Sequence, residues 1–462
     1  MGRRKYADLE LFIDEEEFLG RGSARFGDKR IVVKRALLGQ KVLARARLCG
    51  REVLEGRLLR VLERAEGEVE PACPDFGACG GCMYQSLTYA DETARKERLA
   101  RALLAPFSAG AEYLGLTPSP VLRGYKNKME YSFGDGGPGS ALELGMRRTG
   151  GFYETVTARD CSLVDNDFRK IVSETLSFFR ESGEAFYHTR RHTGVLRHLI
   201  IRKARFTGEI LVNLETAGGL TADLGGYAGV ISRLDTDGRV EGVLHTLNNS
   251  LSDAVKPEEV RTLFGRDFIT EELFGLKFRV TPFSFFQTNS AGAEALYGLV
   301  RGLTEEIPAP GNGGLKVFDL YSGTGTIAQI IAGGVKEVTA VELVPEAAAS
   351  ARRAAEENGV GNCRFLTGDV LEVVKKLAEA PASAPDLIIL DPPREGVSPK
   401  ALPKIAGFGA GHILYVSCNP ATLSRDMEKL AGFGYKCVKY AFCDMFPRAA
   451  HLESVALLRK NA

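Results

Sequence analysis

The chain has 462 residues, of which 44% are hydrophobic and 26% are charged, the usual composition of a globular protein. Its apolar runs are too short to cross a bilayer, and residues 1–5 are not followed by the apolar segment of a secretion signal. The net charge of +1 gives no overall attraction to nucleic acid. We therefore expect a cytoplasmic, monomeric protein of about two to four domains with no membrane segment.

Short β-rich runs separated by glycine-containing turns fill residues 8–64. Closely spaced short strands are typical of a small barrel, so we predict an OB-like barrel over residues 1–66. Residues 1–60 carry 15 Lys and Arg against 9 Asp and Glu, and residues 188–206 carry six Lys and Arg, three His and no acidic residue. Locally basic surfaces can bind phosphate even on a neutral chain, and a solvated basic face is the alternative.

Three cysteines, Cys73, Cys79 and Cys82, crowd into ten residues with the spacing C-x5-C-x2-C. In a cytoplasmic chain such crowding indicates metal or redox chemistry more than disulfides. Three thiolates are too few for a closed four-coordinate site, so Cys161 or a histidine is the candidate fourth ligand. The spacing alone favours zinc, and unliganded cysteines are the alternative.

Residues 67–275 combine this cysteine-rich stretch with strand-like runs and glycine-rich turns, and we predict a central domain there. Residues 88–104 have the periodicity of a helix, which we expect to pack on the domain that follows. Residues 308–314, "PAPGNGG", resemble a linker.

After residue 315 short apolar runs alternate with helical stretches, of which residues 345–359 are the clearest. This alternation predicts a third domain, residues 276–462, with a doubly wound α/β fold built on a parallel sheet. Ligands of such sheets bind beyond the carboxyl ends of the strands. The residues at these ends are Asp319, Glu342, Asp369, Asp391 and Cys418.

A glycine-rich turn, "DLYSGTGTIA" at residues 319–328, joins the first of these strands to a helix. Gly323 and Gly325 let the backbone approach a ligand closely. Glu342, at the end of the next strand, is placed to accept hydrogen bonds from ribose hydroxyls, as in both NAD and S-adenosylmethionine sites. The strand end "LDPPREG" favours S-adenosylmethionine, because Asp-Pro-Pro strand ends are familiar from methyltransferases. Asp369 either accepts from the adenine amino group or caps a helix.

An apolar run from His412 to Val416 ends in Ser-Cys-Asn-Pro, which places Cys418 at a strand end beside the expected methyl donor. A free buried cysteine is usually a small apolar side chain. Here the thiol is followed by Asn-Pro, which forms a turn, and a downstream cluster, "MFPRAAHLES", supplies Glu453. A nucleophilic thiol with a nearby carboxylate base is the favoured hypothesis.

Four motifs together carry a family resemblance. They are "TPFSFFQTN" at residues 281–289, "DPPREG", "ILYVSCNPAT" sixteen residues later, and "HLESV", in which Glu453 stands 35 residues after Cys418. On these motifs the chain resembles the 5-methyluridine RNA methyltransferases over nearly its whole length. It departs from the family pattern at Arg448-Ala449, where Gln, His or Tyr followed by Ser or Thr is common, while His451 is in place.

The resemblance implies methyl transfer to uracil C5, in which Cys418 adds to C6 of the base and Glu453 removes the C5 proton. The target uridine must then be unpaired or flipped out of a helix. Arg394 would line the pocket between uracil and methyl donor, or it forms a structural ion pair. The residues implied to contact S-adenosylmethionine are Gln287, Tyr321, Gly323, Thr326, Glu342, Asp369 and Asp391.

A subgroup of this family binds a 4Fe-4S cluster on the same cysteine pattern, with the fourth thiolate at the position of Cys161. The resemblance therefore implies a 4Fe-4S cluster in place of zinc. The N-terminal barrel resembles the TRAM domain, an OB-like RNA-binding module. Members with these cysteines modify large-subunit ribosomal RNA, so 23S ribosomal RNA is the favoured substrate and the T-loop of transfer RNA is the alternative.

Two other classes of protein stay open. An amino methyltransferase acting on adenine or cytosine also uses Asp-Pro-Pro, but usually with an aromatic residue next, where this chain has Arg394, and it needs no cysteine. A non-catalytic metal-cluster RNA-binding protein would not need Glu342, Asp391, Cys418 and Glu453 together.

Overall fold

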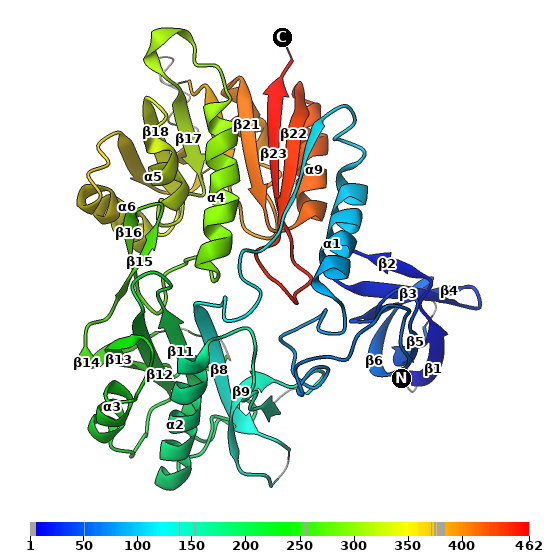
Figure 1. Cartoon of the computed structure of the whole chain (residues 1–462), viewed down its shortest axis with the longest axis vertical. Coiled ribbons are helices and arrows are strands. Elements are labelled where there is room, and N and C mark those ends of the chain that lie inside the picture. Colours follow the sequence, from blue (N-terminus) through cyan, green and yellow to red (C-terminus); the bar gives the residue numbers. More distant parts are fainter. Residues whose placement is uncertain are drawn as a thin grey trace.

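The computed structural model describes residues 6–49, 51–137, 139–151, 154–252, 255, 257–370, 372–373, 376 and 384–461 (Figure 1). Residues 1–5, on which the expectation about a secretion signal depends, lie outside these ranges. Within them no helix is both long and apolar enough to span a membrane.

The N-terminal strands form a six-stranded sheet with the order β1-β5-β6-β4-β3-β2. Its pairs are antiparallel except for β4 with β6. Alternate residues of β5, Val42, Ala44 and Ala46, pack with Ile31 and Val33 into a core of their own. The strands are β1 (Tyr6–Phe12), β2 (Glu15–Glu17), β3 (Arg21–Phe26), β4 (Lys29–Lys34), β5 (Lys41–Arg47) and β6 (Val53–Glu63).

A seven-stranded sheet, with the order β10-β9-β8-β11-β12-β13-β14, forms the lower part of Figure 1. Its apolar face packs on helices α2 (Asn166–Ser182) and α3 (Leu224–Ser232), with Phe168, Leu199 and Tyr227 in the shared core. The strands are β8 (Lys128–Asp135), β9 (Leu142–Arg147), β10 (Thr155–Val156), β11 (Leu196–Lys203), β12 (Glu209–Thr216), β13 (Arg239–Leu247) and β14 (Glu259–Gly265). The hairpin β15 (Ile269–Leu273) and β16 (Leu276–Val280) leads to the third sheet.

An eight-stranded sheet, with the order β19-β18-β17-β20-β21-β23-β22-β7, forms the upper part of Figure 1. Strands β19, β18, β17, β20 and β21 pair in parallel, as predicted. The complete sheet is mixed, since β23 is antiparallel to both β21 and β22. The short connection between β22 and β23 allows only an antiparallel pair. The strands are β7 (Glu112–Thr117), β17 (Lys316–Leu320), β18 (Glu337–Glu342), β19 (Cys363–Thr367), β20 (Leu387–Leu390), β21 (His412–Ser417), β22 (Tyr435–Cys443) and β23 (Glu453–Lys460).

Helices cover both faces of this sheet, because its inner strands are apolar on both sides. In β20, for example, Leu387 and Ile389 belong to one core while Ile388 and Leu390 belong to the other. Helices α4, α5 and α6 line the first face, and α1, α8 and α9 line the second. These helices are α1 (Tyr89–Leu104), α4 (Ser290–Glu305), α5 (Thr326–Ala332), α6 (Pro345–Glu357), α8 (Leu402–Gly407) and α9 (Pro420–Ala431).

Two elements from early in the chain belong to this third sheet and its cover. Helix α1 packs Leu99, Ala100 and Leu104 into the second core, and β7 pairs with β22 at the edge of the sheet. The domain boundaries at residues 66 and 275 remain predictions. The helix expected over residues 88–104 is α1, and it packs on the eight-stranded sheet as expected.

The glycine-rich turn gives a test of how tightly this body is packed. An alanine Cβ at Gly325 (φ +72°) would lie 2.5 Å from Phe365 Cε1 and 2.9 Å from Ala351 Cβ. We expect Gly325→Ala to lower the free energy of unfolding by about 2–5 kcal/mol. This loss is the sum of the overpacking and of the cost of a left-handed conformation for alanine.

Gly434 (φ +86°) is the matched control, because a Cβ there meets no atom within 4 Å. Gly434→Ala should lose only about 1–2 kcal/mol in urea unfolding followed by circular dichroism. Equal losses for the two variants would contradict the packing argument.

Candidate active site

The carboxyl ends of the parallel strands meet at one edge of the eight-stranded sheet. Glu342 is the last residue of β18, and Asp391 and Cys418 follow directly after β20 and β21. Glu453 begins β23, and the register of β23 with β21 places this start beside the end of β21. The fold therefore brings the predicted nucleophile and base to the edge that carries the expected cofactor residues.

The glycine-rich turn holds the carboxylate of Glu342 in place. The Gly323 N–H donates to Glu342 Oε2 at 2.8 Å, and the Val344 N–H donates to Oε1 at 2.8 Å. Tyr321 starts the turn with a φ of 70°, and Thr326 is the first residue of α5. Each carboxylate oxygen keeps a lone pair, so the group can still accept from ribose hydroxyls.

Asp369 stands between β19 and a short helical turn. Its carbonyl accepts from the N–H groups of Glu372 at 3.1 Å and Val373 at 2.9 Å. Burial and then the charge of Asp369 raise the pKa of Tyr321 to about 12, so the carboxylate lies near the glycine-rich turn. Both predicted roles, helix cap and adenine acceptor, agree with this position.

Gln287 precedes α4, and its loop is bound by Asn127, the residue before β8 of the seven-stranded sheet. The Asn127 Nδ2 donates to the Gln287 carbonyl and to Ser290 Oγ, both at 2.8 Å, and its N–H donates to the Thr288 carbonyl at 2.9 Å. The Gln287 side chain bonds the hydroxyl of Tyr297. Asn127 is therefore the anchor of the Gln287 loop.

Cys418 presents a half-buried thiol at the tip of β21. Burial and the Glu453 carboxyl raise its pKa to about 11, while the Arg394 guanidinium bonds the thiol and opposes this rise. The next residue, Asn419, caps α9, because its Oδ1 accepts from the Ala421 N–H at 3.1 Å. The amide therefore starts a helix, which leaves the thiol as the candidate reactive group of the motif.

Several carboxyl groups share the buried region around Cys418. Burial raises the pKa of Glu453 to about 8, and Asp391 adds to the rise while Arg394 opposes it. Burial also raises the pKa of Asp391 to about 7 and that of Asp319 to about 8. A carboxyl group with a raised pKa beside a thiol fits a general base. Sequence reasoning placed Asp319 at a strand end but gave it no role, although an acidic residue before a glycine-rich turn was the available signal.

Arg394 lies between Cys418 and His451. Burial, followed by the charge of Arg394, lowers the pKa of His451 to about 4, so the imidazole is neutral at pH 7. Its Nε2 lies 3.4 Å from Arg394 Nη2 and accepts from the guanidinium. The Arg394 carbonyl accepts from Asn419 Nδ2 at 3.3 Å, which ties it to the same turn. Of the two roles left open by the sequence, this position favours the pocket residue.

The cysteines of the predicted cluster come together in the structure. They line one cavity of about 30 Å³: Cys73, Cys79, Cys82 and Cys161. Burial raises the pKa of the Cys82 thiol to about 11, and the neighbouring thiols add to this rise. Among the described residues no group of three or more His, Cys, Asp or Glu is arranged to hold a metal ion. The structure thus assembles the four predicted ligands without a preformed metal geometry.

Donors and cations surround these thiols. The Gly81 N–H donates to Cys79 Sγ at 3.4 Å, and Gln85 Nε2 donates to Cys82 Sγ at 3.5 Å. Arg35 Nη2 donates to the Cys82 carbonyl at 2.6 Å, and Lys126 lines the cavity. Burial lowers the pKa of Arg35 and of Lys126, and thiolate charges oppose this lowering. The donors from Gly81 and Gln85 oppose the rise in thiol pKa that burial causes, without cancelling it.

Comparisons with known proteins indicate the family of this chain. Residues 254–461 match the family model described as tRNA (Uracil-5-)-methyltransferase. An uncharacterized RNA methyltransferase of Clostridium tetani is 42% identical over 462 residues, which is 100% of this chain and 99% of that protein. One from Caldanaerobacter subterraneus is 40% identical over 450 residues, or 97% of this chain and 98% of that protein.

A solved structure shows the same fold. It is the Pyrococcus abyssi tRNA (uracil-54, C5)-methyltransferase in complex with S-adenosyl-L-homocysteine, with a TM-score of 0.74 and 24% identity over 97% of this chain and 100% of that one. From the family model and the full-length relatives, the chain belongs to the family of S-adenosylmethionine-dependent RNA uracil-5 methyltransferases.

Proposed function

We propose that this protein transfers a methyl group from S-adenosylmethionine to C5 of a uridine in RNA through a covalent bond between Cys418 and uracil C6. The observation that carries the proposal is the convergence of Cys418, Arg394 and Glu453 at the strand edge that also holds the glycine-rich turn. Neither an amino methyltransferase nor a simple RNA-binding protein needs a thiol and a carboxylate base side by side.

Cys418 acts first, as the nucleophile. The thiolate sulfur bonds to uracil C6, and the electrons of the C5–C6 double bond move to C5 and the O4 enolate. C5 then attacks the methyl carbon, and the carbon–sulfur bond of the donor breaks with its electrons going to the donor sulfur. Arg394 favours the thiolate, because it is the cation that lowers the pKa of Cys418.

Glu453 acts second, as the base. It takes the C5 proton, the C–H electrons restore the C5–C6 double bond, and the C6–S bond breaks with its electrons returning to Cys418. The pKa of about 8 makes the ionised Glu453 a stronger base than an ordinary carboxylate.

Two substitutions separate these steps. We expect Cys418→Ala to abolish methyl transfer while S-adenosylmethionine binding, followed by calorimetry, stays within about twofold. Glu453→Gln should instead accumulate a protein–RNA adduct that migrates as a shifted band on a denaturing gel. Substantial turnover by Cys418→Ala would disprove the nucleophile assignment, and Cys49→Ala serves as a cysteine control outside the site.

The proposed substrate is 23S ribosomal RNA, because the cysteine pattern resembles the ribosomal-RNA subgroup. The T-loop of transfer RNA is the alternative, and the Pyrococcus abyssi protein of the same fold is named for that reaction. Mapping 5-methyluridine in ribosomal and transfer RNA from a deletion strain distinguishes the two. The position of the missing modification identifies the substrate.

The N-terminal sheet is the proposed TRAM-like RNA-binding module. A cross-strand row places four cations side by side between two acids, in the order Glu17, Arg21, Lys34, Arg57, Arg45 and Asp8. The outer cations pair with Glu17 at 3.8 Å and with Asp8 at 2.6 Å. Lys34 and Arg57 are exposed, and no ion pair joins them to an acid in the described part of the chain. Adjacent unpaired cations repel each other, and a phosphate would relieve that repulsion.

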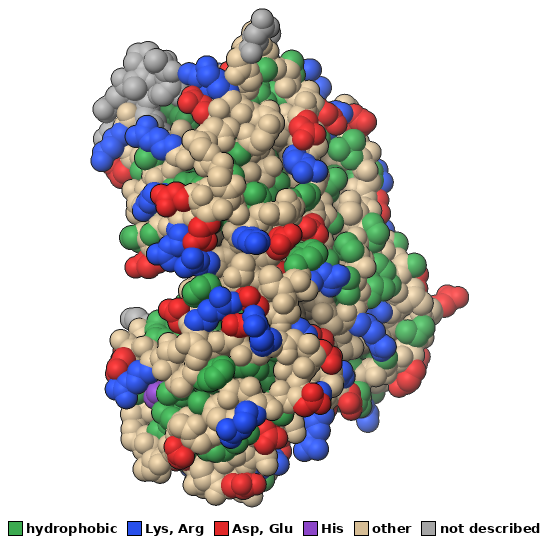
Figure 2. Space-filling model, turned by 60° about the vertical axis from the view of Figure 1, so that its left-hand side comes forward, with side chains coloured by type: hydrophobic (Ala, Val, Ile, Leu, Met, Phe, Trp, Pro, Cys, Tyr) green, Lys and Arg blue, Asp and Glu red, His purple; other side chains and the backbone are tan. Residues whose placement is uncertain are grey.

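Basic side chains also border a second region. Figure 2 shows the surface notched between its upper and lower parts, with Lys and Arg side chains on both sides of the notch. This arrangement supports an RNA path that passes between the central sheet and the eight-stranded sheet.

We expect the double variant Lys34→Gln/Arg57→Gln to bind RNA more weakly and to reduce the slope of log K against log salt by about 1–2. Arg353→Gln/Lys404→Gln makes the same change in net charge at exposed positions on α6 and α8 and should leave the slope unchanged. Filter binding across a salt series measures both. An unchanged slope in the first variant would rule out phosphate contacts from this row.

A 4Fe-4S cluster is proposed for the cysteine cavity. Four thiols on one cavity supply the required donor set, and N–H donors and the partly buried Lys126 lie where they would offset thiolate charge. When bound, the cluster would supply a covalent link between residues 73–82 and Cys161. Methyl transfer needs no electrons, so its role is in folding or RNA docking.

Anaerobically purified protein should be brown and contain about four iron atoms per chain. We expect Cys161→Ala to lose the colour and the iron, whereas Cys49→Ala, outside the cavity, should keep both. Stoichiometric zinc without iron in the unaltered protein would overturn the assignment.

A further inference from the structure

The connection between β22 and β23, residues 444–452, leads directly into Glu453 and is held from outside the eight-stranded sheet. The N–H groups of Met83 and Tyr84 donate to the Arg448 carbonyl at 2.6 and 3.1 Å. From the central part of the chain, the Tyr125 hydroxyl donates to the Pro447 carbonyl at 2.9 Å. Segments far away in sequence therefore fix the path of this connection.

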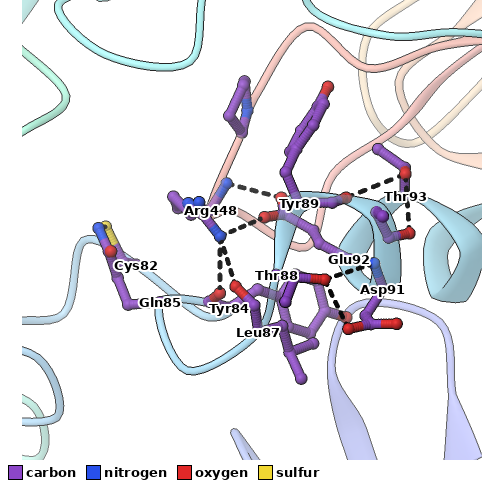
Figure 3. Close-up of polar contacts among 12 residues, drawn as sticks. Cys82, Tyr84, Gln85, Leu87, Thr88, Tyr89, Asp91, Glu92, Thr93 and Arg448 are labelled. Carbon is purple, nitrogen blue, oxygen red and sulfur yellow. Dashed lines mark hydrogen bonds and ion pairs between the residues drawn. The ribbon is translucent and has the colours of Figure 1, made fainter. Parts of the chain in front are cut away.

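Arg448 directs both its backbone and its side chain toward one partner, residues 84–92 (Figure 3). Its N–H donates to Glu92 Oε1 at 2.6 Å, and its Nη1 donates to the Leu87 carbonyl at 2.8 Å and to Glu92 Oε2 at 3.3 Å. Its φ of 70° is left-handed, a strained conformation for a residue with a side chain. The contacts of the guanidinium and the backbone bonds of the same residue together keep this conformation in place.

A buried ion network links helix α1 to the start of the β22–β23 connection. Lys96 donates to Glu92 Oε1 at 2.8 Å and to Asp444 Oδ1 at 2.9 Å, and all three side chains are at most 1% exposed. The network contains two acids and, with Arg448, two cations. Removing the guanidinium leaves a buried excess of negative charge, which makes the loop position depend on Arg448.

The end of the same connection lies close both to the pocket and to the residues that follow Cys82. Ala450 packs against Met83 and Tyr84, and Cys82, which lines the cavity, is the residue before Met83. The next residue, His451, accepts from Arg394, the cation beside Cys418. One short path thus runs from the cavity to the pocket.

We propose that Arg448 is a positioning residue that holds Glu453 at uracil C5. Release of the methylated base then depends on residues 82–87 keeping their ordered conformation. The proposal rests on the proposed function, in which Glu453 takes the C5 proton, the double bond re-forms and the C6–S electrons return to Cys418. It gives a role to the position where this chain departs from the pattern of the family. One guanidinium nitrogen, Nη1, reaches Leu87 and Glu92 together.

Arg448→Gly is the informative variant, because glycine adopts the left-handed conformation freely and only the guanidinium is lost. We expect single-turnover experiments to show adduct formation at the rate of the unaltered protein and product release at least tenfold slower, so that adduct accumulates. The KM for S-adenosylmethionine should stay within about twofold, and Arg448→Lys should recover part of the release rate. Hydrogen exchange should become faster at residues 83–87 and 446–451.

Arg353→Gly, at an exposed arginine on α6, is the matched control and should change none of these values. Normal product release by Arg448→Gly would overturn the proposal. So would a loss in which adduct formation, release and S-adenosylmethionine binding all fall by the same factor, since that is general destabilisation. If Glu453→Gln forms no adduct, the proposed function itself fails, whereas an adduct there with normal release by Arg448→Gly rejects only the role of Arg448.

Discussion

Arg394 is the cation that lies beside the Cys418 thiol and the Glu453 carboxyl group. Burial raises the pKa of Cys418, Glu453 and Asp391, so in the free protein these groups favour their neutral forms. A nucleophilic thiolate and a carboxylate base are both anions, and a low-dielectric pocket opposes both. Arg394 opposes the rise in the pKa of the thiol and of Glu453, and it adds to the effect of burial that keeps His451 neutral. The charge balance of the site therefore depends on the guanidinium of Arg394.

The scaffold meets this electrostatic demand by assembling the pocket from distant segments. Parallel strands bring the cofactor residues and Cys418 to one edge, and an antiparallel strand adds Glu453 from the other direction. The segment before β8 then holds two loops in place: Asn127 bonds the Gln287 loop, and Tyr125 bonds the β22–β23 connection. A rigid support of this kind is what keeps reacting groups within the small tolerances of catalysis.

The parts that were predictable from sequence are those in which local pattern determines structure. Apolar runs that end in polar residues predicted the parallel strands, and Pro345 at the start of α6 fits a first helical turn. The position of β23 was not predictable, because strand order depends on pairing between segments that share no local signal. The partners of Arg448 were equally hidden, since residues 84–92 lie at the other end of the chain. The contact of Asn127 with Gln287 was hidden for the same reason, since it exists only in the folded molecule.

The covalent bond between Cys418 and uracil is the central claim, and mass spectrometry of the trapped complex tests it most directly. Glu453→Gln protein is incubated with substrate RNA and S-adenosylmethionine, digested with nuclease and protease, and the modified peptide is sequenced. The account predicts that the peptide containing Cys418 carries a methylated uridine nucleotide. A nucleotide attached to another cysteine, or methylated RNA formed with no modified peptide, would contradict it.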